Sequence, residues 1–94
     1  MLGEEMEKVA ELFKALSNEN RLKILIQISE KEKCVHDLSD QLNLSYSNIS
    51  HHLRKLKDKD LIKKRKVGKH RYYTLKNKEI KKIIDRGTEY VKKP

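Results

Sequence analysis

Residues 44–53 read Leu-Ser-Tyr-Ser-Asn-Ile-Ser-His-His-Leu, and most of the fold prediction rests on them. Ser45 is a favourable N-cap residue, and Ile49, Leu53 and Leu56 then recur at steps of four and three. This spacing predicts a helix with one buried side. Another short helix is predicted over residues 35–42, and only a polar turn separates the two. The sequence therefore predicts a helix-turn-helix.

A basic β-hairpin is predicted next. Two short β-prone runs, at residues 61–62 and 72–75, flank a polar stretch that turns at Gly68. Further helices are predicted over residues 4–16, after a cap at Ser17 or Asn18, and after Asn77. The helix after that cap is apolar nearly all round and should form the buried centre. The expected fold is mainly α with a small β-hairpin, a winged helix-turn-helix in the order α-α-α-α-β-β-α.

Length and composition narrow the class of protein. The 94 residues predict a single winged-helix domain over residues 1–94, with a thin core. No apolar run approaches the roughly 18 residues that span a bilayer, and the first residues lack a secretory signal, so we expect a cytoplasmic protein with no membrane partner. We expect no enzyme, because neither a Ser/His/Asp order nor a Gly-rich phosphate loop stands out.

Positive charge is concentrated in one part of the chain. The formal net charge is +9, and residues 51–76 carry 11 basic against 2 acidic side chains, which equals the whole excess. Residues 1–32, in contrast, carry 5 basic against 7 acidic side chains. Such a charge run can be an ordinary solvated surface. Beside a predicted helix-turn-helix and wing, it predicts binding to a polyanion, above all duplex DNA.

The first and last predicted helices carry more apolar surface than so small a core can bury. We expect a second copy, related by a two-fold axis, to cover it, although both stripes could instead pack onto their own chain. A two-fold homodimer would place two recognition helices in successive major grooves about 34–36 Å apart and so read a palindrome. The predicted interface consists of Met6, Val9, Phe13, Ile80, Ile83, Ile84 and Val91.

Four segments carry a resemblance to a known family. They are residues 13–25 (Phe-Lys-Ala-Leu-Ser-Asn-Glu-Asn-Arg-Leu-Lys-Ile-Leu), 34–38 (Cys-Val-His-Asp-Leu), 44–53 and 68–73 (Gly-Lys-His-Arg-Tyr-Tyr). Together, and in this order, they resemble the ArsR/SmtB family of metal-responsive winged-helix repressors. The resemblance implies a dimeric transcriptional repressor that binds a palindromic operator until an inducer releases it.

The resemblance also indicates where DNA would bind. The family's recognition-helix contacts fall on Tyr46, Ser47, Ser50 and His51, although a tyrosine departs from the small or amide residue often found first. Hydroxyls and an imidazole can bond base edges or phosphates. Basic residues nearby should contact the phosphate backbone, with the wing tip in or beside the minor groove. This second set consists of Arg54, Lys66, Lys69, His70 and Arg71.

A candidate metal site is predicted at the start of the third helix. Arsenic and cadmium sensors of the family carry the motif Glu-Leu-Cys-Val-Cys-Asp-Leu there; Cys34 matches its first cysteine and His36 replaces its second. With Asp37, these residues offer ligands for zinc, cadmium or cobalt as an inducer. The set is incomplete, because the N-terminal arm that a partner would contribute has only glutamates. Cys34, the only cysteine, could equally be a packing residue or a redox-sensitive thiol.

The family's second metal site lies on the last helix. Its positions fall here on Asn77, Glu79, Tyr90 and Lys93, of which only Glu79 could ligate a metal. We therefore expect this site to be absent.

Three other interpretations remain open at this stage. A regulator of the same fold could be blind to metals and respond to another signal. An architectural nucleic-acid binder would use the positive face without preferring an operator to random DNA. A protein-interaction module on the same scaffold would not bind duplex DNA even at low salt.

Overall fold

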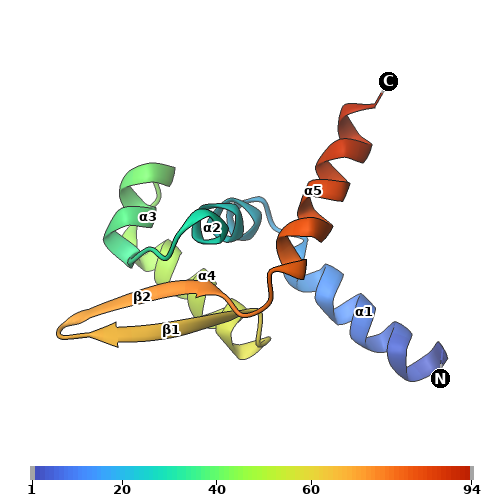
Figure 1. Cartoon of the computed structure of the whole chain (residues 1–94), viewed down its shortest axis with the longest axis horizontal. Coiled ribbons are helices and arrows are strands. Elements are labelled where there is room, and N and C mark those ends of the chain that lie inside the picture. Colours follow the sequence, from blue (N-terminus) through green and yellow to red (C-terminus); the bar gives the residue numbers. More distant parts are fainter. Residues whose placement is uncertain (1, 94) are drawn as a thin grey trace.

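The fold is organised around its second helix. The computed structural model describes residues 2–93, with the elements α1 (Leu2–Leu16), α2 (Glu19–Glu30), α3 (Val35–Leu42), α4 (Tyr46–Asp58), β1 (Ile62–Val67), β2 (His70–Leu75) and α5 (Glu79–Lys92) (Figure 1). This is the predicted order. The four other helices and β2 all contact α2. Of the two predicted caps for α2, Asn18 is used, because its side chain accepts a hydrogen bond from the Arg21 N–H at 3.0 Å.

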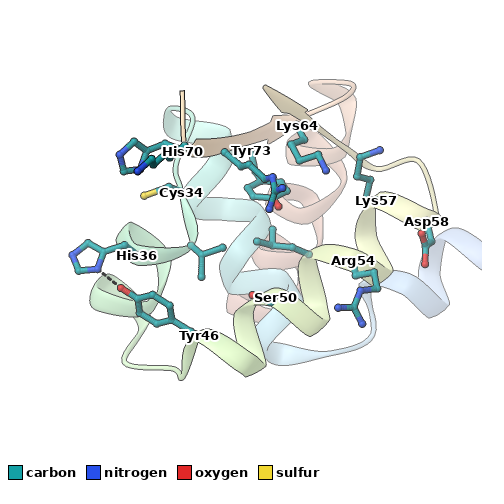
Figure 2. Close-up of a pocket in the computed structure, with 14 residues that line it drawn as sticks. Cys34, His36, Tyr46, Ser50, Arg54, Lys57, Asp58, Lys64, His70 and Tyr73 are labelled. Atoms are coloured by element: carbon teal, nitrogen blue, oxygen red, sulfur yellow. Dashed lines mark hydrogen bonds between the residues drawn. The ribbon is translucent and has the colours of Figure 1, made fainter. Parts of the chain in front are cut away.

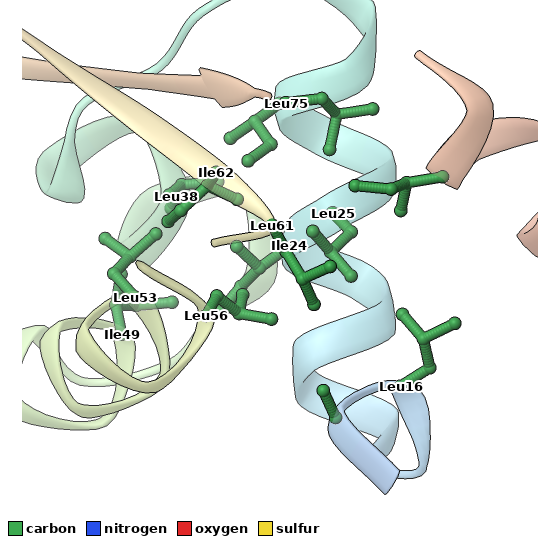
Figure 3. Packing of buried hydrophobic residues seen from close by; sticks show 13 residues of the cluster. Leu16, Ile24, Leu25, Leu38, Ile49, Leu53, Leu56, Leu61, Ile62 and Leu75 are labelled. Atoms are coloured by element: carbon green, nitrogen blue, oxygen red, sulfur yellow. The ribbon is translucent and has the colours of Figure 1, made fainter. Parts of the chain in front are cut away.

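Helix α2 also supplies the centre of the hydrophobic core. Its residues Ile24, Leu25 and Ile28 are completely buried, as the nearly all-round apolar pattern predicted. Leu38 of α3 and Ile49 of α4 belong to the same buried cluster (Figure 3). Each fully buried aliphatic side chain of this size stabilises the fold by about 1.5–3 kcal/mol. The core therefore fixes α3 and α4 against α2.

A tight turn sets the angle between α3 and α4. Asn43 ends α3 in the left-handed region, with φ 55°, a conformation that asparagine tolerates better than most residues. The Ser39 hydroxyl donates to the Leu44 carbonyl at 2.6 Å and so ties the turn to α3. Ser45 then caps α4, because its hydroxyl oxygen accepts the Asn48 N–H at 3.0 Å. The helix-turn-helix is confirmed, with the predicted cap.

The wing hairpin is longer than the sequence predicted. Its two strands pair antiparallel from Ile62 opposite Leu75 to Val67 opposite His70, and Gly68 turns the chain with φ 61°. The prediction covered only residues 61–62 and 72–75. Residues 63–66 are all lysine or arginine and all exposed, so they show no apolar alternation that would reveal a strand.

The base of the wing is held by the α2–α3 connection. Tyr73 of β2 and Lys33 exchange two backbone hydrogen bonds, of 3.1 and 2.8 Å. Because a two-stranded ribbon alone is marginally stable in water, this isolated bridge helps to fix the wing to the helical body.

Helices α1 and α5 extend away from the body on the side opposite the wing tip (Figure 1). Helix α1 begins at Leu2, two residues before the predicted start. Much of their apolar surface is open to solvent: Met6 is 52% exposed, Phe13 54% and Val91 80%. Neither these helices nor any other within residues 2–93 combines the length and hydropathy needed to cross a membrane.

One residue of the predicted dimer interface lies elsewhere. Ile80 is only 6% exposed and belongs to the chain's own core, so it is not part of the free apolar surface. Ile83 and Ile84 are partly buried against that core. The reason is that the N-terminal part of α5 packs against the body, whereas its C-terminal end extends away from it.

Candidate nucleic-acid interface

Helix α4 presents a polar face to solvent. Its inward side is apolar, with Ile49 and Leu56 completely buried, so the opposite side must point outward. The residues predicted to face outward are all exposed: Tyr46, Ser47, Ser50, His51 and Arg54. Serine and histidine side chains of this kind can reach base edges without steric bulk.

A groove of about 800 Å³ separates this helix from the wing (Figure 2). Its walls come from three elements far apart in the sequence: the start of α3, the exposed side of α4, and the wing. Of the residues predicted to bind DNA, the groove brings together Tyr46, Ser50, Arg54, Lys69, His70 and Arg71.

The remaining predicted contacts lie outside the groove lining. Ser47, His51 and Lys66 are exposed, and Lys66 pairs with Arg71 across the hairpin. Both walls of the groove carry positive charge, with Arg54 and Lys57 on α4 and Lys64 on the wing. Asp58 is the one acidic residue in the lining. A groove with cations on both sides suits the backbone of a nucleic acid.

One wing cation is paired within the chain. Arg65 donates from Nε to Glu32 Oε2 at 3.1 Å, and its Nη2 pairs with Oε1 of the same carboxylate. The hydrogen bond from Arg65 lowers the pKa of Glu32, and the carboxylate in turn raises the pKa of Arg65. This pair was not predicted from the sequence, because nothing in the linear pattern relates positions 33 residues apart.

The predicted metal ligands are not brought together. Asp37 acts as a cap, because its Oδ2 accepts the Cys34 N–H at 3.2 Å, and this backbone hydrogen bond holds the pKa of Asp37 below its usual value. Within residues 2–93 no three His, Cys, Asp or Glu side chains are grouped as metal ligands. Asp37 is thus engaged in capping α3, and the ligand set of Cys34, His36 and Asp37 stays a prediction.

His36 has a different partner. Its Nδ1 forms a hydrogen bond with the Tyr46 hydroxyl, and the two rings meet edge to face with centroids 6.0 Å apart. The contact joins the first turn of α3 to the first residue of α4 (Figure 2). Both residues were predicted at functional positions, but their contact was not predicted from the sequence.

Other polar groups occupy the positions of the family's second site. Asn77 Oδ1 accepts the Glu79 N–H at 2.9 Å, which helps to start α5. Glu79 accepts a hydrogen bond from Lys82 at 3.1 Å. Tyr90 is 80% exposed, near the end of the same helix. Asn77 and Glu79 therefore form hydrogen bonds that stabilise the start of α5.

Comparisons with known proteins agree with this geometry. Residues 18–64 match the family described as "Bacterial regulatory protein, arsR family". A cadmium resistance transcriptional regulatory protein CadC homolog from Staphylococcus aureus is 42% identical over 84% of this chain. A transcriptional repressor SmtB homolog from Synechocystis is 35% identical over 82% of this chain. The matched part spans 66% and 58% of these two relatives.

The fold comparison agrees as well. The homodimeric winged helix-turn-helix DNA-binding domain Mb0332 from Mycobacterium bovis superposes with a TM-score of 0.84, at 24% identity, over 95% of this chain and 82% of that domain. The predicted winged helix-turn-helix is thereby confirmed. The matched family and relatives are regulators and not enzymes, as expected. The chain belongs to the arsR family of bacterial regulatory proteins.

Proposed function

We propose that this chain is a single-domain, cytoplasmic transcriptional repressor that binds a palindromic operator in duplex DNA as a homodimer. The observation that carries the proposal is the basic groove beside the exposed Ser/His face of α4. In this arrangement α4 enters the major groove, where Ser50 and His51 contact base edges. The wing follows the phosphate backbone towards the minor groove.

The dimer is supported by the apolar surface of the end helices. A groove of about 610 Å³ lies between α1 and α5, lined in part by Phe13, Leu16, Ile83, Ile84 and Val91. Helix α1 continues the apolar surface through Met6 and Val9. A second copy can cover both helices about a two-fold axis, and a two-fold pair matches a palindrome. The homodimeric domain of the same fold agrees with this assembly.

Binding titrations on two duplexes test the DNA function. The wild-type chain selects a preferred duplex from a randomised pool, and its affinity is compared with that for a random duplex of equal length. We expect a ratio of about 10³ or more. Ser50→Ala and His51→Ala should each reduce this ratio about tenfold. Equal losses on both duplexes for His51→Ala would refute its base-reading role.

The rival functions give different results in the same titration. An architectural binder would hold both duplexes with similar affinity. A protein-interaction module would bind neither duplex at low salt. Either result would overturn the proposed repressor.

For the inducer, we propose a signal other than a metal held by Cys34, His36 and Asp37. The thiol and the free Nε2 are too few donors for a closed site, and Asp37 is engaged in capping. The names of relatives such as the CadC homolog favour the opposite view. Operator binding with zinc, cadmium or cobalt, repeated with Cys34→Ser, separates the two. We expect no change, and metal-driven release that needs the thiol would contradict us.

A further inference from the structure

We propose that His36 is a positioning residue for DNA recognition that acts through Tyr46, an inference that rests on the proposed function. The resemblance would assign His36 to a metal. Its observed contact is with the first residue of α4, one of the side chains that should meet DNA. His36 thus gains a role in which no ion takes part.

The geometry joins two exposed side chains at the end of the groove. His36 is exposed, and Tyr46 is 53% exposed, so the core does not immobilise either ring. The hydrogen bond at Nδ1 and the edge-to-face contact, with rings inclined by 69°, are the contacts that hold them. Both residues line the groove together with Ser50 (Figure 2). The pair therefore forms part of the surface that DNA would touch.

A physical reason links this contact to specificity. A half-exposed tyrosine at the start of a helix samples several rotamers, and ordering it on binding costs conformational entropy. A hydrogen bond to His36 selects one rotamer before DNA arrives. The neutral imidazole accepts at Nδ1 when its proton is on Nε2, and the Tyr46 hydroxyl is then the donor. The hydroxyl oxygen keeps a lone pair for DNA, at a position that His36 determines.

Four variants separate positioning from a general structural role. His36→Ala removes the acceptor, whereas His36→Asn keeps an acceptor oxygen near the place of Nδ1. Tyr46→Phe removes the hydroxyl and keeps the ring. The double variant His36→Ala/Tyr46→Phe closes the thermodynamic cycle. Affinities are measured for the duplex selected by the wild-type chain and for a random duplex, with a chelator present, and thermal unfolding verifies that each variant is folded.

We expect His36→Ala and Tyr46→Phe each to lower the affinity ratio about threefold to tenfold, the range of one hydrogen bond. The double variant should be no worse than Tyr46→Phe alone, and His36→Asn should recover most of the ratio. Losses that multiply in the double variant, or no recovery with asparagine, would overturn the inference.

The same data distinguish the two proposals. If the wild-type chain prefers its selected duplex and His36→Ala keeps that preference, the positioning role is wrong and the repressor stands. If the wild-type chain shows no preference for any duplex, both the proposed repressor function and the positioning role are wrong.

Discussion

Adjacent histidines on α4 have opposite environments. His51 is exposed on the proposed DNA face, whereas His52 is only 7% exposed on the inner side. Its Nδ1 finds no hydrogen-bond partner among residues 2–93. Burial lowers the pKa of His52 from its ordinary value of 6.5, and the positive charge of Arg21 lowers it further. Folding therefore favours the neutral form of this imidazole.

The His52 environment predicts a pH dependence of folding. Above about pH 6.5 neither state binds the proton, so the fold keeps its full stability; below it, the unfolded chain binds the proton first and the free energy of unfolding falls. Replacing His52 with leucine should remove this loss of stability below about pH 6.5. Denaturant titrations at several pH values measure it. The three acidic groups with lowered pKa, Glu11, Glu32 and Asp37, change protonation at lower pH and so do not contribute to this loss. A His52→Leu chain with the wild-type slope in this window would show that another group is responsible.

At the scale of elements, the wing is a charged ribbon tied to the body through its base. Its strand residues 63–66 are exposed, and the backbone bridge at Lys33 and the Glu32–Arg65 pair help to fix it to the body. A cation engaged by a carboxylate is less available to phosphates. Glu32 therefore holds one cation of the wing, Arg65, in an ion pair within the chain.

Removing this restraint should strengthen DNA binding. In Glu32→Gln, Arg65 is released and one negative charge is lost, so affinity for operator and random duplex should rise together. The log-log slope against salt should become steeper by up to about 0.9. Glu30→Gln makes the same charge change at an exposed site that forms no ion pair with residues 2–93, and it serves as the control. Equal effects of both variants would point to overall charge and not to Arg65.

The wing tip gives the opposite prediction. Lys66→Ala should weaken binding to operator and random duplex alike, because a backbone contact carries no sequence information. The slope against salt should become shallower by about 0.9 if one phosphate contact is lost. Titrations at several salt concentrations measure both quantities, with Lys8→Ala on α1 as the control. A selective loss on the operator would instead make Lys66 a base-reading residue.

At the scale of the whole molecule, the two ends of the chain leave the body and carry its exposed apolar surface. Phe13 and Val91 remain open to solvent because they lie outside the core cluster around α2. Dimerisation and DNA binding are therefore expected on different sides of the protein. A substitution in α1 or α5 can therefore disrupt the dimer while the DNA-contacting residues of α4 and the wing stay unchanged.

Disrupting the dimer should also weaken operator binding. Phe13→Asp and Val91→Asp place a charge on the proposed interface, and sedimentation velocity should then show monomers at concentrations where the wild-type chain is dimeric. Affinity for a palindrome should fall towards that for a half-site. Val67→Asp, an exposed apolar residue of the wing, should leave the mass unchanged. Charged α1 and α5 variants that stay dimeric would place the interface elsewhere.

Local patterns determined much of this protein from the sequence alone. The order of elements, the cap at Ser45 and the outward face of α4 depend on residues a few positions apart, and these predictions are confirmed. The strands of the wing were predicted too short, because a ribbon of lysines and arginines pairs through its backbone and leaves no pattern in its side chains.

Only the tertiary structure determined which residues far apart in the sequence contact one another. Glu32 meets Arg65 across 33 positions, and His36 meets Tyr46 across a helix and a turn. Ile80, at the start of α5, is buried in the core. Asp37 caps its own helix by accepting the Cys34 N–H. The physical reason is that side-chain partners depend on how packed helices bring chain segments together, whereas periodicity records only which side of an element is buried.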